Sequence, residues 1–242
     1  MATALALDRR RPSMRARLFA VIALAPLLVL PSLGHAAPIT VPTSLLPGQQ
    51  YRLAFVTAGT RDATSSSIAD YDAFVTAEAN TEVALSSISW QVLGSTAAVS
   101  ARDHTGTAPA NYPGVPIFLL NDVKLVDDYA DLWDGSVDTP LAINQHGADH
   151  REHMVWTGTY YTGVGLPQAL GQFSTITGST GSIGGQLFGP AWIYGGDRQY
   201  GLNLYYYAMS EVLSVPVPEP RPTALLTLDF AALLLLRRLR LF

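Results

Sequence analysis

An apolar run lies near each end of the chain, and the folded domain is therefore expected in the residues between the two runs. Residues 1–36 contain five arginines, then an apolar run of 15 residues from Phe19 to Leu33, then Gly34-His35-Ala36. This order is typical of a secretory signal peptide, and the small residues favour cleavage before Ala37. A membrane anchor is the alternative, but the run contains two prolines and is shorter than the roughly 20 residues that a spanning helix needs.

The charge between the two ends limits the partners of the folded part. The whole chain of 242 residues has a formal charge of −4, but residues 38–216 hold only six of the 15 cations and sixteen of the 19 acids, a net charge of −10. Phosphates and anionic lipids are bound through Lys and Arg, so this charge excludes nucleic acid as a partner and suits cations or neutral sugars. The chain has no cysteine, which excludes disulfides, thiol nucleophiles and cysteine-bound zinc.

The hydrophobic pattern of residues 51–215 predicts one α+β domain with short antiparallel strands, one or two early helices and long irregular loops. Residues 37–50 are expected to be a linker, and the last strand is expected to pair with the first. Strands are predicted over 51–57, 89–94, 99–102, 115–120, 154–157, 191–194 and 202–215.

Residues 68–80 are predicted to form a helix with one face against the core, because apolar residues recur there at helical spacing. Ser67, with Asp70 three positions later, is typical of a capping box at the start of a helix. Residues 122–132 are an acidic, helix-like run, and residues 158–189 form a loop rich in Gly, Ser and Thr. The apolar residues of the predicted helix face are Ile68, Tyr71, Phe74, Val75 and Ala79.

A proline-rich tetrapeptide, an apolar run and a pair of arginines follow one another in residues 216–242. They are Val217-Pro218-Glu219-Pro220, residues 223–236 and Arg237-Arg238. This order resembles the PEP-CTERM sorting tail, in which an exosortase in the inner membrane of a Gram-negative bacterium recognises the tail and cuts near the motif.

The resemblance to a sorting tail implies two processing partners, signal peptidase and an exosortase, and a transient insertion of the tail into the membrane. The exported domain would then reach the outer surface or the extracellular matrix. Two features depart from the pattern. The apolar run is about 14 residues long, and Asp229 lies within it at a cost of roughly 2.5–3.5 kcal/mol for insertion. A plain membrane anchor is the alternative.

Four segments of the middle resemble, in the same order, parts of the C-type-lectin-like fold in the version seen in endostatin. They are Ala69–Phe74, Val115–Asp122, Tyr129–Ser136 and Val155–Gly158. The resemblance covers residues 51–215 and implies a fold without implying a function. The cysteines of that family, the arginine-rich surface of endostatin and the sugar-binding Glu-Pro-Asn triplet are absent from the sequence, so no ligand-binding residue carries over.

Two polar clusters are candidates for metal binding. His146, His150 and His153 lie within eight residues, and imidazoles from one loop are able to converge on zinc. The aspartates of residues 127–134 offer oxygen ligands for calcium. For both clusters the alternative is a solvated polar surface. The four aspartates are Asp127, Asp128, Asp131 and Asp134.

Tyrosines are the remaining candidates for ligand binding. Their rings would stack against sugars, although alternation between core and surface positions explains them equally well. They are Tyr160, Tyr161, Tyr194, Tyr200 and Tyr205–Tyr207.

Three functions remain open from the sequence. The first is an exported binding or structural protein without enzymatic activity or cofactor, which would bind a glycan or a surface protein. The alternative from another class is a metal-dependent hydrolase that uses His146, His150, Glu152 and His153. The third is a passive matrix component without a specific ligand.

Overall fold

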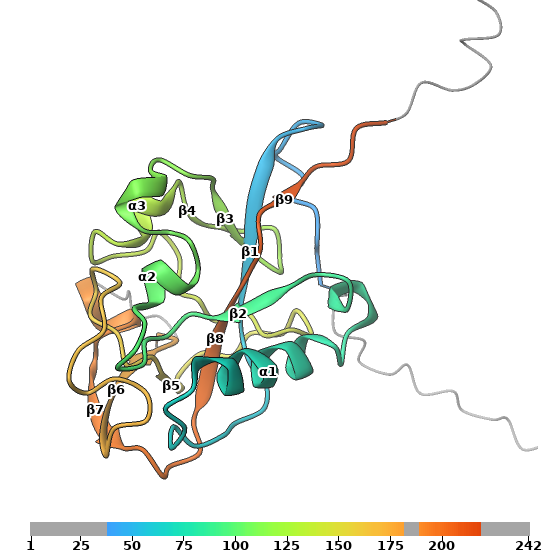
Figure 1. The fold of residues 1–242 in the computed structure, drawn as a ribbon. Helices are drawn as coiled ribbons and strands as arrows, with labels where there is room; N and C mark the ends of the chain where they lie inside the picture. The colour runs from blue at the N-terminus through green and yellow to red at the C-terminus, as the bar shows by residue number, and fades with distance from the viewer. Residues whose placement is uncertain (1–37, 182–188, 219–242) are drawn as a thin grey trace, which may run out of the picture. The chain divides into compact units, whose positions relative to one another are not determined.

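The computed structural model describes residues 38–181 and 189–218. The expected signal peptide lies outside the described residues, and so does the expected sorting tail from Glu219 onward. The described residues form a mixed α+β structure with a sheet at its centre and few helices (Figure 1). None of the helices in this part of the chain has the length and apolar character needed to cross a membrane.

The described part of the chain contains nine strands, three α-helices and three 3-10 helices. The strands are β1 (Gln50–Val56), β2 (Trp90–Val92), β3 (Ile117–Leu119), β4 (Lys124–Val126), β5 (Met154–Trp156), β6 (Ser174–Ser179), β7 (Gly196–Gln199), β8 (Tyr205–Ser210) and β9 (Leu213–Ser214). The helices are α1 (Ile68–Ala79), α2 (Ala101–His104) and α3 (Tyr129–Leu132), with 3-10 turns η1 (Val83–Leu85), η2 (Pro109–Asn111) and η3 (Gly189–Trp192).

Strand β1 lies within the sheet, whose strand order is β4-β3-β1-β8-β5-β6-β7, with β2 also paired to β8 and β9 to β1. It runs parallel to β3, with Arg52 opposite Ile117, and antiparallel to β8, with Ala54 opposite Met209. The predicted pairing of the last strand with the first is therefore confirmed. The sheet is mixed rather than purely antiparallel, because β5 and β8 also run parallel.

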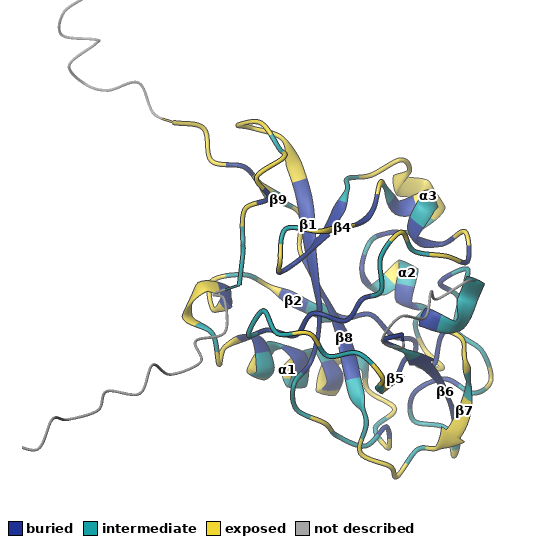
Figure 2. Cartoon of the chain, turned by 180° about the vertical axis from the view of Figure 1, so that it is seen from behind, coloured by how far each residue is buried: buried dark blue, intermediate teal, exposed yellow. Residues whose placement is uncertain are grey.

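Helix α1 packs against β2 and β8 and buries the face that the sequence predicts (Figure 2). Tyr71, Val75 and Ala79 are fully buried, and the ring of Tyr71 stacks on Tyr206 of β8 with the centroids 5.4 Å apart. Ile68 and Phe74 of the same predicted face are partly buried and pack against the core. The 3.6-residue period of the apolar side chains thus placed the helix and its face correctly.

The predicted capping box at the start of α1 is not formed. Ser67 occupies the N-cap position with an extended backbone, but its side chain makes no capping hydrogen bond. Asp70 instead accepts a hydrogen bond from the hydroxyl of Ser65 at 2.6 Å. The carboxylate of Asp70, in the first turn of α1, thus bonds a hydroxyl from the segment before the helix rather than the N–H of the N-cap residue.

Strand β6 lies inside the segment that the sequence analysis expects to be an irregular loop, and this expectation is wrong. Its sequence is Ser-Thr-Ile-Thr-Gly-Ser, which has no apolar alternation, yet its four central residues are buried. Thr175 and Thr177 satisfy their hydroxyls by donating to the backbone oxygens of Gln172 (2.6 Å) and Gly196 (3.4 Å). Buried threonines that bond the backbone resemble a loop in sequence and a core strand in structure.

The acidic run of residues 122–132 is not a helix throughout. Asp122 has a φ of 69° in the turn between β3 and β4, and β4 pairs antiparallel with β3. Only α3 is helical, and its N-cap Asp128 accepts from the backbone N–H groups of Ala130 and Asp131. The acids serve turn and cap positions, where short polar side chains replace missing backbone partners.

Two predicted strands are helical turns. Residues 99–102 include the start of α2, where the N–H of His104 donates to the carbonyl of Ser100 at 2.9 Å. Residues 191–194 overlap η3, where the N–H of Tyr194 donates to the carbonyl of Pro190 at 2.7 Å. Apolar runs this short have no period that separates a strand from a turn of helix. The strands predicted at 89–94, 115–120 and 154–157 are confirmed, with shorter bounds.

Candidate functional site

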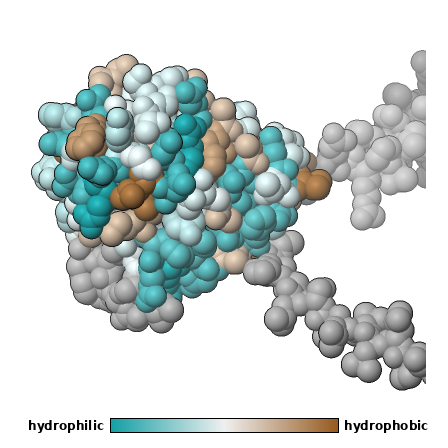
Figure 3. All heavy atoms as spheres, turned by 90° about the horizontal axis from the view of Figure 1, so that it is seen from below, coloured by the Kyte–Doolittle hydropathy of each residue, from teal (hydrophilic) through white to brown (hydrophobic). Residues whose placement is uncertain are grey.

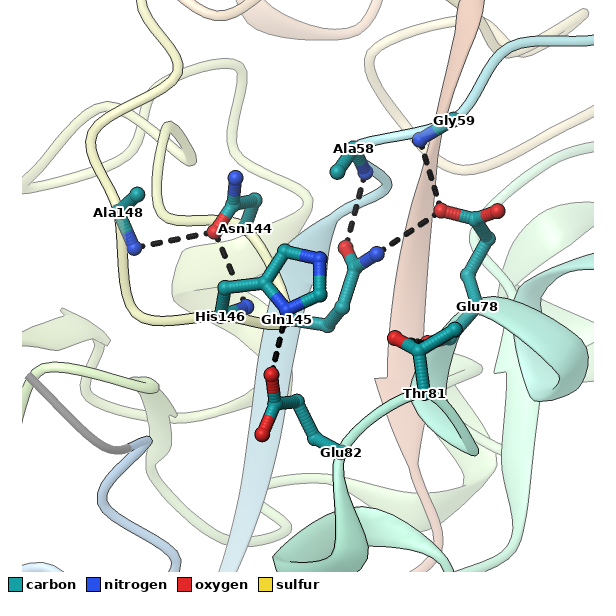
Figure 4. A network of polar contacts seen from close by, with 9 residues as sticks. All are labelled: Ala58, Gly59, Glu78, Thr81, Glu82, Asn144, Gln145, His146 and Ala148. Atoms are coloured by element: carbon teal, nitrogen blue, oxygen red, sulfur yellow. Dashed lines mark hydrogen bonds and ion pairs between the residues drawn. The ribbon is translucent and has the colours of Figure 1, made fainter. Parts of the chain in front are cut away.

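His146 belongs to a polar network that ties the end of α1 to two loops (Figure 4). Its Nδ1 lies 2.5 Å from a carboxylate oxygen of Glu82. The turn that carries it is held by Asn144, whose Oδ1 accepts from the N–H groups of His146 and Ala148 at 3.0 Å each. The imidazole is therefore engaged in a contact that holds the loop against the helix end.

Glu78 is the hub of the same network (Figure 4). Its Oε2 accepts from the N–H of Gly59 at 2.7 Å and from Nε2 of Gln145 at 2.9 Å. Gln145 is 1% exposed, and its Oε1 accepts from the N–H of Ala58 at 2.8 Å. A carboxylate and an amide thus satisfy backbone donors in the loop after β1, which explains why polar side chains are buried there.

His150 and His153 lie together, and the ring of Tyr205 contacts both of them. The two imidazole centroids are 4.3 Å apart, and they lie 4.5 Å and 4.6 Å from the centroid of Tyr205. Burial lowers the pKa of the His150 imidazole, and the neighbouring His153 lowers that pKa further, against the opposite effect of Asp149. This pair forms a packed, partly buried aromatic group that favours a neutral His150.

The three histidines do not converge as three ligands would. Among the described residues, one group of three candidate metal ligands has its ligand atoms within 4.8 Å of one another. It consists of Asp127, Asp131 and Asp138 and contains no histidine. His146 pairs with the carboxylate of Glu82, whereas His150 and His153 contact each other. The histidine cluster of the sequence is therefore divided in the structure between two contacts.

The acidic group differs from the set that the sequence suggests. Asp138 joins Asp127 and Asp131, whereas Asp128 caps α3 and Asp134 bonds Ser136. Lys124 bonds the carboxylate of Asp127, and Asp131 accepts from the backbone N–H of Asp127. Burial raises the pKa of Asp131, and Asp138, Asp134 and Asp127 raise it further. Asp127 and Asp131 thus have partners within the protein, and an exposed acidic group of this kind supplies no argument for a bound ion by itself.

Five of the seven candidate tyrosines fall into two sets, whereas Tyr205 contacts the histidine pair and Tyr200 contacts Phe173. Tyr206 and Tyr207 are fully buried and belong to the core. Tyr160, Tyr161 and Tyr194 lie at the surface, where the ring centroid of Tyr160 is 4.2 Å from that of Tyr161 and 5.0 Å from that of Tyr194. Three partly exposed rings from two separate segments therefore meet at one place.

An open pocket of about 520 Å³ has Tyr161, one of the three surface tyrosines, in its lining, and the sequence pattern did not indicate it. Its lining combines the turn after α3 with Tyr161 and the start of η3, which are distant in the sequence. The hydrophobic residues on the face shown in Figure 3 lie in small separate groups among hydrophilic ones. The lining residues of the pocket are Asp134, Gly135, Ser136, Tyr161, Gly189 and Pro190.

The start of the proposed sorting motif is exposed. Val215 is the last buried residue of the domain at 8% exposure, whereas Val217 is 66% exposed. Pro218 is also exposed, and the remaining motif residues, Glu219, Pro220, Arg237 and Arg238, lie outside the described residues. The domain is thus complete two residues before the motif begins.

No family model matches the sequence, and no curated protein matches it either.

Proposed function

We propose that the chain is an exported protein of the cell surface or extracellular matrix of a Gram-negative bacterium, delivered by signal peptidase and an exosortase and acting by binding rather than catalysis. The observation that carries the proposal is the abrupt end of the domain before the motif. Backbone hydrogen bonds of 2.9 Å join Val215 to Gly48 and to Gln49, and the exposed Val217 follows directly. A processing enzyme would reach this point without unfolding the domain.

We further propose that the domain has a C-type-lectin-like fold. Three features support this proposal: the first and last strands pair with each other, the long helix α1 follows β1 and packs on the same sheet, and Trp156 of the Val-Trp-Thr-Gly segment is fully buried in β5. The two ends of such a domain lie together, and the chain between them forms the surface that is available for binding.

The binding interpretation is favoured over the hydrolase interpretation by the contacts of the histidines. His146 pairs with Glu82, and the rings of His150, His153 and Tyr205 all contact one another. These contacts connect parts of the fold to each other. The pocket lined by Tyr161 and Asp134 offers both apolar and polar groups to a partner.

Export and sorting are tested by expressing the full chain in a Gram-negative host with and without a functional exosortase. We expect cleavage before Ala37 in both hosts, and loss of the tail with transfer to the outer surface or medium only in the host with the exosortase. N-terminal sequencing and intact mass of the fractionated protein give both cleavage positions. Pro218→Ala with Glu219→Gln is expected to leave the tail uncut and the protein in the membrane fraction.

The matched control for the motif variant is Glu211→Gln, which changes an exposed carboxylate in the connection between β8 and β9. It is expected to be processed as the wild type is. Equal processing of the motif variant and the wild type, or retention of the wild type in the cytoplasm, would contradict the proposed function.

A further inference from the structure

We infer that the pocket between Asp134 and Tyr161 binds a neutral oligosaccharide. The inference rests on the proposed function and deepens it, because it names a ligand class and a site for the exported domain. Three features of the pocket carry it: a set of aromatic rings, a fixed carboxylate and a rigid support.

The ring of Tyr161 lines the pocket and provides a surface on which a sugar ring would stack, and the rings of Tyr160 and Tyr194 continue the aromatic cluster next to it. Tyr160 packs against Tyr161 with an interplanar angle of 43° and meets Tyr194 edge to face at 74°. The side chain of Tyr194 is 36% exposed, and the other two are partly exposed. A pyranose presents C–H groups on its faces and hydroxyls on its rim, which matches an aromatic ring with a polar tip.

The carboxylate of Asp134 provides acceptors for sugar hydroxyls. Its Oδ1 accepts from the backbone N–H of Ser136 at 2.9 Å and from the Ser136 hydroxyl at 3.1 Å. These two hydrogen bonds fix the side chain at the pocket wall while Oδ2 keeps its acceptor capacity. Binding sites for small molecules usually combine an apolar or aromatic surface with a few polar groups that orient the ligand. Asp134 beside Tyr161 is such a combination.

The pocket rests on the core, so it is formed before a ligand arrives. Gly135 has a φ of 109°, and a Cβ at this position would lie 3.3 Å from Cδ2 of Tyr161, so the ring packs directly on the turn. Trp133 and Trp192, which are adjacent to or near the lining residues in the chain, are 5% and 0% exposed, with their centroids 6.1 Å apart. Support of this kind holds side chains in one geometry, which favours binding.

Charge selects a neutral ligand. Asp134 is the charged residue among those that line the pocket, and residues 38–216 carry ten more acids than cations. A uronic or sulfated glycan would place its anions beside this carboxylate without a Lys or Arg from the lining to balance them. Repulsion and desolvation therefore oppose anionic glycans, whereas hydroxyl donors of a neutral sugar suit Asp134.

The test is calorimetric titration of the purified full chain, in a detergent without a sugar headgroup, with neutral glucan and mannan hexasaccharides and with a uronic-acid hexasaccharide. We expect saturable binding of at least one neutral ligand and at least about tenfold weaker binding of the uronic ligand. Tyr161→Ala and Asp134→Asn are each expected to weaken binding by about tenfold or more, the effect of losing one stacking or charge-assisted contact.

Phe173→Ala is the matched control, because Phe173 is an aromatic residue with 64% exposure that does not line the pocket. Its affinity is expected to equal that of the wild type. Tyr161→Phe keeps the ring and is expected to keep binding, and Asp134→Asn changes an exposed residue, so the test does not depend on the folding of Tyr161→Ala alone. Circular dichroism of each variant confirms that it is folded.

Three outcomes would overturn the inference: no heat of binding from the folded wild type with millimolar neutral ligand, equal affinity of the wild type and both pocket variants, or preference for the uronic ligand. Its failure is distinguishable from failure of the proposed function. A protein that is exported and processed but binds no neutral glycan overturns the site alone, whereas a protein that stays in the cytoplasm overturns the proposed function whatever it binds.

Discussion

Tyr206 and Tyr207 are adjacent in β8, and both are buried, but only one of their two hydroxyl groups has a hydrogen-bond partner among the described residues. Successive side chains of a strand point to opposite faces, and Tyr206 packs on Tyr71 of α1 whereas Tyr207 packs near Trp192. The hydroxyl of Tyr206 donates to the carbonyl of Asp62 at 2.7 Å. The hydroxyl of Tyr207 is buried without a hydrogen-bond partner among the described residues, and burial raises its pKa.

Replacing each of these tyrosines by phenylalanine separates the two situations. Tyr207→Phe is expected to leave the free energy of unfolding unchanged or to raise it, because a buried unpaired hydroxyl costs about 1–3 kcal/mol. Tyr206→Phe loses a hydrogen bond and is expected to lower it by about 1 kcal/mol. Urea denaturation measures both values, and a larger loss for Tyr207→Phe than for Tyr206→Phe would show that its hydroxyl has a partner.

The His150 imidazole makes stability depend on pH in a defined direction. Its pKa is lowered in the folded protein from an ordinary value of 6.5, mainly by burial, so the unfolded chain binds the proton more readily. The contribution to stability is fully present above about pH 6.5 and is lost as pH falls through the folded pKa. Asp149 opposes the shift and His153 adds to it, while Tyr205 packs on the ring.

His150→Gln is therefore expected to reduce the loss of stability between pH 7.5 and pH 5. The measurement is the free energy of unfolding at a series of pH values for the wild type and the variant. The Cε1–H chemical shift of His150 gives an independent reading of its pKa by NMR. A titration midpoint at or above 6.5 would contradict the assigned direction.

At the level of elements, α1 is fixed to the sheet by apolar contacts along its length and by polar contacts at its end. Glu78, near the C-terminus of α1, takes two hydrogen bonds from outside the helix, whereas Glu82, just beyond it, pairs with the half-exposed His146. A carboxylate near a helix C-terminus is unfavourable toward the helix dipole. Its position at Glu78 is explained by the backbone donor and the buried amide that it satisfies.

Glu78→Ala is expected to lower the free energy of unfolding by roughly 2–3 kcal/mol, because it leaves the N–H of Gly59 and the buried amide of Gln145 without their acceptor. Glu82→Ala is the matched control in the adjacent turn, and we expect a loss of about 1 kcal/mol or less for its partly exposed pair. Denaturant unfolding of both variants compares them directly. Equal losses would mean that the network around Glu78 adds nothing beyond a surface ion pair.

For the whole domain, closure depends on the return of the chain to its first strand. Leu213 of β9 pairs with Tyr51 of β1, and Val215 is the final core residue before the exposed motif. Among the described residues, β9 is thus the last strand to pair with β1, and Val215 is the last to join the core.

Two truncations test this boundary. A chain of residues 37–217 is expected to be as stable as the chain that ends at Phe242, because nothing beyond Val215 belongs to the described core. A chain that ends at Glu211 is expected to lose at least roughly 2–4 kcal/mol, because it lacks the buried Val215 with its two backbone hydrogen bonds and the pairing of β9 with β1. Thermal and urea unfolding compare them, and equal stability of the two truncations would contradict the proposed boundary.

The expectations that succeeded rest on apolar side chains, which recur at helical spacing in α1 and form apolar runs in β1 and β3. Strand β1, strand β3 and helix α1 each carry enough buried hydrophobic residues in sequence order to be found without knowledge of their neighbours. The pairing of the last strand with the first followed from the same pattern. The mixed α+β class was predictable for this reason, since class depends on the kinds and order of elements.

The sequence by itself determined these apolar elements and the acidic, cation-poor character of the domain, because both are local properties of the chain. Only the tertiary structure decided where β6 lies, which aspartates group with Asp138, that His146 is held by Glu82, and that Asp134 and Tyr161 share a pocket. The physical reason is that the local sequence does not determine which partner a polar side chain will hydrogen-bond, and therefore does not determine where it lies in the fold. Each of these partners lies far away in the sequence and is brought near by the packing of the apolar elements.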